Sequence, residues 1–197
     1  MAYQIVELTC PGCGARVRTD QTECEWCRSP IIVSTFNSVY SMPLQMVNKY
    51  AKTYKNVLES CPNDTRINNS IAMCYLKLKL YDQALAAFEK AIEDDFDNSE
   101  TYFYAAICLL KGQKPFLQQR QVIDKIIEYI NAANMIEPKG IYYYFLAYIK
   151  YDYFERKKFN VSPDYKQVLS EAKKIGYSKN DAEQLFAILG VDRPQCL

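Results

Sequence analysis

Hydrophobic and polar positions change their spacing near residue 34. Residues 15–19 alternate small or apolar with basic side chains, and the apolar residues 31–33 favour a closing strand. From residue 43 to about residue 190, apolar positions instead recur with a helical period. Proline, glycine and asparagine mark the breaks between the helices. The predicted helices span 43–60, 65–79, 82–94, 99–111, 119–136, 140–157, 163–174 and 179–189.

Two CxxC pairs lie in the strand-like part of the chain, Cys10 with Cys13 and Cys24 with Cys27. Zinc takes four ligands in a tetrahedron, and two short CxxC turns that face each other supply four thiolates. The chain contains no histidine, so four cysteines are the only zinc ligands of the usual nitrogen or sulfur type. The sequence predicts one structural Zn²⁺ ion held by these four cysteines.

The stretch CPGCGARV…CEWC resembles the short zinc ribbons found at the N-terminus of many prokaryotic proteins. Arg28 departs from that pattern, because glycine is common after the last cysteine. A disulfide pair and a redox-active CxxC are the two alternatives. The absence of a secretory signal disfavours a disulfide. A second CxxC pair at this distance favours zinc over a redox-active CxxC.

Residues 65–98 span 34 positions with small and aromatic side chains at fixed intervals. Small residues at Ala72 and Ala84 let two antiparallel helices approach, while Tyr75 and Phe88 fill the space beside them. The segment resembles a tetratricopeptide repeat (TPR), and helices 99–111 and 140–157 repeat its theme more weakly. The predicted fold is mainly α, a TPR-like antiparallel helix-pair solenoid with a small N-terminal β zinc ribbon.

This organisation divides the chain into a zinc ribbon over residues 1–35, a linker over 36–42 and a TPR-like domain over 43–197. The last two helices would form a polar-edged cap. The resemblance implies a concave groove lined by the first helix of each pair, where a protein partner would bind. The candidate groove residues are Arg66, Asn69, Ser70, Met73, Phe103, Tyr104 and Ile107. The alternative is that these side chains only pack within the repeats.

Aromatic side chains crowd residues 141–154 (IYYYFLAYIKYDYF). A helix can bury aromatic residues on every side only if other elements surround it, so some rings would otherwise be exposed or contact a partner. Packing within the repeats and against the cap helices is the favoured interpretation.

Composition removes several classes of function. The net charge is +1, which argues against bulk electrostatic capture of nucleic acid. Without histidine there is no serine–histidine or cysteine–histidine nucleophile pair, and no glycine-rich phosphate loop is present. The sequence therefore predicts a protein that is not an enzyme. No apolar run is long enough to cross a membrane, so we expect a cytoplasmic protein.

The favoured function is a non-enzymatic protein–protein interaction adaptor or scaffold, in which the ribbon is a structural or second docking module. One alternative is a nucleic-acid-binding accessory protein that uses Arg16, Arg18 and the lysines of 150–179, because residues 141–180 carry eight basic and four acidic side chains. A further alternative is a regulatory subunit of an enzyme complex. Exposed tyrosines would allow self-association.

Overall fold

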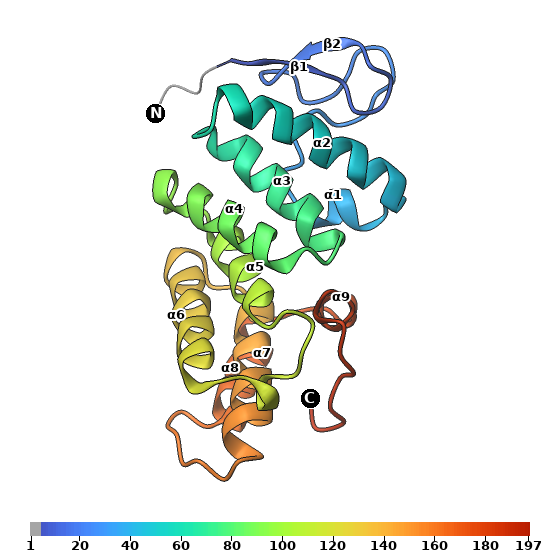
Figure 1. Cartoon of the computed structure of the whole chain (residues 1–197). Coiled ribbons are helices and arrows are strands. Elements are labelled where there is room, and N and C mark those ends of the chain that lie inside the picture. The colour runs from blue at the N-terminus through green and yellow to red at the C-terminus, as the bar shows by residue number, and fades with distance from the viewer. Residues whose placement is uncertain (1–4) are drawn as a thin grey trace. The chain divides into compact units, whose positions relative to one another are not determined.

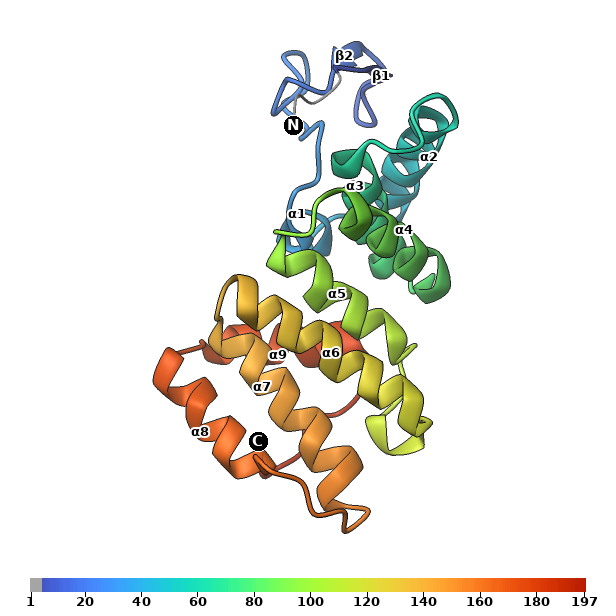
Figure 2. The same cartoon turned by 90° about the vertical axis from the view of Figure 1, so that its left-hand side faces the viewer.

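The computed structural model describes residues 5–197. The chain divides into two compact units, and the division falls between Phe96 and Asp97. The elements of the first unit, in chain order, are β1 (Glu7–Thr9), β2 (Arg16–Arg18), α1 (Phe36–Tyr40), α2 (Leu44–Ser60), α3 (Thr65–Lys77) and α4 (Tyr81–Asp94) (Figure 1). The elements of the second unit are α5 (Ser99–Leu109), the 3-10 helix η1 (Pro115–Leu117), α6 (Arg120–Ile136), α7 (Gly140–Ile149), the π-helix η2 (Lys150–Glu155), α8 (Tyr165–Ile175) and α9 (Lys179–Leu189) (Figure 2).

Successive helices pack against one another in the first unit, α2 on α3 and α3 on α4 (Figure 1). Helix α3 begins after Asp64, whose carboxylate accepts a hydrogen bond from the Ile67 amide at 3.1 Å, as an N-cap does. Ala72 and Ala84 are fully buried where α3 meets α4, and the Phe88 ring fills the space beside them. The small-residue positions of the predicted repeat therefore lie in its core.

The ribbon is a two-stranded antiparallel sheet in which Leu8 lies opposite Val17. Each predicted helix has a counterpart within a few residues, but three local predictions were wrong or incomplete. Residues 31–33 form no strand, because their carbonyls accept hydrogen bonds from helix side chains and not from a strand. The expected linker 36–42 contains helix α1, and the predicted helix 140–157 changes to a π-helix at Lys150.

Helix α7 is the centre of the second unit, packed by α6, α8, α9 and the π-helix that follows it (Figure 2). Phe103 from α5 adds a ring contact, with its centroid 4.6 Å from that of Tyr142. Tyr144 and Tyr148 are fully buried, and each packs against Phe186 of α9. Because other elements surround α7, its aromatic side chains are mostly core residues of the unit, as the favoured interpretation of the sequence expected. In the described part of the chain, no helix combines the length and apolar character needed to span a membrane.

The contact between the start of α7 and the end of α8 depends on glycine. A Cβ at Gly140 would lie 2.1 Å from the carbonyl oxygen of Gly176 and 2.9 Å from that of Ala172. Both are backbone atoms, so the helices themselves would have to separate. We expect Gly140→Ala to lower the free energy of unfolding by about 1–3 kcal/mol, the usual cost of overpacking. Thermal and denaturant unfolding followed by circular dichroism measure this.

The control for that substitution is Asn131→Ala at an exposed position of α6. Its unfolding midpoint should stay within the small range typical of surface changes. Equal midpoints for Gly140→Ala and Asn131→Ala would show that the two helices separate without cost.

Candidate metal centre

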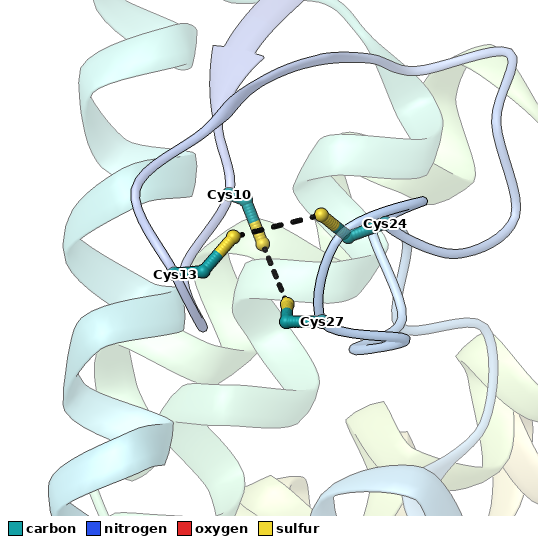
Figure 3. Close-up of side chains that lie close together, drawn as sticks. All are labelled: Cys10, Cys13, Cys24 and Cys27. Carbon is teal, nitrogen blue, oxygen red and sulfur yellow. Dashed lines mark hydrogen bonds between the residues drawn. The ribbon is translucent and has the colours of Figure 1, made fainter.

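The four cysteines of the two CxxC pairs converge at one point of the ribbon (Figure 3). Cys10 and Cys13 come from the turn after β1, and Cys24 and Cys27 come from a second turn facing it. All four sulfur atoms lie within 4.8 Å of one another. The Cys10–Cys27 distance is 3.5 Å and the Cys13–Cys24 distance is 3.7 Å. Metal–sulfur bonds of about 2.3 Å in a tetrahedron place sulfur atoms about 3.8 Å apart, so the cluster fits a zinc-sized ion.

The two turns share one backbone geometry. The amide of Gly14 donates to the Cys10 carbonyl at 2.9 Å, and the amide of Arg28 donates to the Cys24 carbonyl at 2.8 Å. In both turns the residue after the second cysteine is left-handed, with φ of 80° at Gly14 and 59° at Arg28. Arg28 thus adopts the glycine-like conformation that zinc ribbons use at this position, despite its side chain.

All four cysteines are free thiols, and their sulfur separations far exceed the roughly 2.05 Å of a disulfide bond. Burial raises the pKa of Cys10 to about 12. Hydrogen bonds from the Ser29 hydroxyl and amide lower the pKa of Cys27 to about 6. A divalent ion binds thiolates, so it would displace the proton that Cys10 holds at neutral pH.

The site is closed on one side and supplies every ligand itself. Cys10 and Cys24 are buried, Cys27 is half-buried and Cys13 is exposed. With four protein sulfur atoms around a tetrahedral ion, no coordination position is left for a substrate or for a reactive water molecule. With zinc bound, this donor set would hold the two turns together.

The ribbon is attached to the helices of its own unit through side-chain hydrogen bonds. The Tyr50 hydroxyl donates to the Pro30 carbonyl at 2.7 Å, and the Tyr54 hydroxyl donates to the Ile31 carbonyl at 2.8 Å. Burial raises the pKa of Tyr54 well above its ordinary value, so its hydroxyl remains a donor. Neither tyrosine hydroxyl was assigned an acceptor from the sequence. The available signal for these contacts was the spacing of the two tyrosines, four residues apart on one helix face, because buried tyrosine hydroxyls usually require an acceptor.

The predicted groove residues of α3 contact other parts of the first unit. The Arg66 guanidinium donates to the Thr19 carbonyl at 3.1 Å, and the Ser70 hydroxyl donates to the Val33 carbonyl at 3.0 Å. Asn69 and Met73 are both buried.

The predicted groove residues of α5 belong to the second unit. Phe103 is buried against Tyr142 and Phe145, and Ile107 is fully buried. Tyr104 keeps part of its surface exposed. The two sets of groove residues thus lie in separate units, and most of their side chains are buried.

Some of the basic residues that would serve a nucleic-acid interface contact other parts of the protein, whereas Lys158, Lys166 and Lys173 are exposed. Arg18 pairs with Asp20 at 2.9 Å, while Arg16 is exposed. The Lys150 ammonium is buried and donates to the Pro163 carbonyl at 2.8 Å. Arg156 pairs with a buried acid, Asp152, and Lys157 lies over the Tyr153 ring. These contacts leave a weaker basic surface than the sequence alone indicates.

Helix pairs with small residues at their contacts, together with a four-cysteine cluster beside a β-hairpin, define a TPR-like protein with an N-terminal segment consistent with a zinc ribbon. Two solved structures of MamA, a TPR protein, resemble the chain: "MamA MSR-1 C2" and "MamA AMB-1 P212121". Each superposes with a TM-score of 0.52 at 14% sequence identity. The first match covers 71% of this chain and 83% of the MamA chain, and the second covers 75% and 84%. No protein-family model matches the sequence, and no curated protein does.

The paired left-handed residues give a matched test of the turn geometry. Gly14→Ala would force a side chain into the left-handed region, which costs about 1 kcal/mol, so we expect metal affinity to fall about fivefold. Arg28→Gly relieves the same strain and removes only an exposed ion pair with Glu23. We expect it to leave metal affinity unchanged or slightly higher. Competition titration with a coloured chelator measures both, and an equal loss in the two variants would contradict the shared geometry.

Proposed function

We propose that the protein is a non-enzymatic adaptor or scaffold for protein partners, with one structural zinc ion in its ribbon. The observation that carries the proposal is the fold, because sequential antiparallel helix pairs of the TPR type serve most often to hold protein segments. Among the described residues, the four cysteines are the one group of histidine, cysteine or acidic side chains placed to hold a metal ion, and a closed four-thiolate zinc site does no chemistry on a substrate.

Zinc is the proposed ion because the sulfur geometry and the donor set suit it. A segment of about thirty residues is too small to fold on its hydrophobic core alone, so the metal would supply folding free energy. Because a four-thiolate site requires reduced cysteines, we propose a reducing compartment such as the cytoplasm as the protein's location.

The partner surface proposed here lies on α5, where Tyr104 is the predicted groove residue that keeps part of its side chain exposed. It stands beside Phe103 with ring centroids 5.3 Å apart. Exposed tyrosines are enriched at protein interfaces because a rigid ring buries much area at low entropic cost. Whether partner binding also alters an enzyme's activity separates an adaptor from a regulatory subunit.

The metal is tested by content. Protein purified without added chelator should hold close to one zinc per chain by elemental analysis, and Cys10→Ser/Cys13→Ser should lose it because two of four ligands are gone. The matched control is Cys61→Ser/Cys196→Ser, which changes two cysteines outside the cluster and should retain the ion. A wild-type protein free of zinc, or a control that loses it equally, would refute the assignment.

The partner class is tested by affinity purification of the tagged full-length chain from its native cells. We expect a protein in stoichiometric amount that survives nuclease treatment. Tyr104→Ala should lower its recovery several-fold, whereas Tyr165→Ala, a half-buried tyrosine of the cap helix α8, should not. Recovery of nucleic acid alone, with binding that weakens steeply as salt increases, would favour the nucleic-acid alternative instead.

A further inference from the structure

One face of α3 is covered along its length by earlier residues of the same chain. Arg66, Ser70, Met73 and Lys77 fall at intervals that share one side of a helix. This set, which we call the α3 face, includes three residues predicted from the sequence to line a partner groove.

The cover consists of the ribbon and the segment that leaves it. Arg66 donates to the Thr19 carbonyl, Ser70 donates to the Val33 carbonyl, and Lys77 donates to the Tyr40 carbonyl. Helix α1 lies between the last two contacts, with Phe36 and Val39 buried in the unit. A chain segment therefore already occupies the position where a bound peptide would lie.

Five hydrogen bonds that hold this cover have the same polarity. Tyr50 and Tyr54 of α2 donate to the carbonyls of Pro30 and Ile31, as Arg66, Ser70 and Lys77 of α3 do to theirs. Side chains of the helices are the donors, and main-chain carbonyls of the cover are the acceptors. Contacts to the main chain hold a peptide whatever its side chains are, which is how peptide-binding surfaces gain affinity without sequence specificity.

The cover is also tied directly to the metal centre. Pro30 is three positions after Cys27 and closes the loop that contains Cys24 and Cys27. Two contacts fasten this loop: the Ile31 amide donates a hydrogen bond to the Thr22 carbonyl at 3.1 Å, and Glu23 forms a β-bridge with Pro30. An ion that fixes Cys24 and Cys27 therefore fixes the loop from which the cover emerges. Small ribbons of this kind lose their fold without metal, so metal loss would remove the start of the cover.

We propose that residues 30–40 are an internal ligand of α2 and the α3 face, and that their docking is coupled to metal binding by the four cysteines. The occupant of this surface is the chain's own segment, released when the metal leaves. Coupling between two binding equilibria is reciprocal, so loss of docking contacts must weaken metal binding by the same factor as metal loss weakens docking. This inference rests on the proposed zinc ion.

Metal removal tests the first direction. Hydrogen exchange with mass spectrometry is recorded on the full chain with zinc and after treatment with a chelator. We expect amide protection in α2 and α3 to fall at least tenfold in the metal-free protein, while α6 and α7 of the second unit change little. Loss of protection confined to residues 5–29, with α2 and α3 unchanged, would overturn the coupling.

Substitution of the docking donors tests the reverse direction. Tyr54→Phe and Ser70→Ala each remove a hydroxyl that donates to the cover and leave the cysteines untouched. We expect Tyr54→Phe to raise the zinc dissociation constant about fivefold, the fold-change that corresponds to a net hydrogen bond. Ser70→Ala should raise it less, because the Ser70 hydroxyl shares its proton between the Val33 carbonyl and the Arg66 carbonyl. The matched control is Tyr148→Phe, because the Tyr148 hydroxyl is buried without a hydrogen-bond partner in the second unit. It should leave zinc affinity unchanged, and far-ultraviolet circular dichroism confirms that every variant is folded.

The outcomes separate this inference from the proposed metal site. If the wild-type protein holds no zinc, the metal assignment fails and the coupling fails with it. If zinc is held but Tyr54→Phe and Ser70→Ala match Tyr148→Phe in affinity, the metal site stands and the coupling is refuted. The coupling is established if both docking variants bind zinc more weakly and the amide protection of α3 depends on the metal.

Discussion

Hydrogen bonding between helix side chains and the main chain of residues 30–33 is the interaction on which the first unit depends. Tyr54 and Ser70 are buried, and a buried hydroxyl without a partner is costly. The Ile31 carbonyl satisfies the Tyr54 hydroxyl, and the Ser70 hydroxyl lies within reach of both the Val33 carbonyl at 3.0 Å and the Arg66 carbonyl of its own helix at 2.7 Å. The same contacts fix the direction in which the chain leaves the second cysteine turn, so the ribbon and the first helix pair share one set of constraints.

Local pattern predicted much of this structure, and its failures have a common cause. Helical periodicity placed the long helices, and CxxC spacing identified the four converging sulfur atoms, because both signals depend on residues close in sequence. The course of residues 31–33 and helix α1 depends instead on α2 and α3, which follow later in the chain. Valine and isoleucine at 31–33 favour a strand locally, but helix donors take the carbonyls that a strand would use.

The groove residues show a different limit of sequence reasoning. A resemblance to a repeat family indicates which helix positions usually face a ligand, yet it carries no information about a segment that lies outside the repeats. Arg66 and Ser70 stand at those positions and bind the chain's own carbonyls. Arg28 is a similar case, because its left-handed conformation is fixed by the turn around Cys24 and Cys27 and not by its own preference.

The position of α7 within the second unit has a consequence for the order of synthesis. Tyr144 and Tyr148 depend for burial on Phe186, which lies in the last helix. The first unit has its internal contacts within the first 96 residues, and it can close while later residues are still being added. The contacts of α7 with α9 cannot form until α9 has been made, so part of the aromatic surface of α7 stays unpaired until then, and unpaired apolar surface invites aggregation. Translation speed through α8 and α9 thus bears on the yield of folded protein.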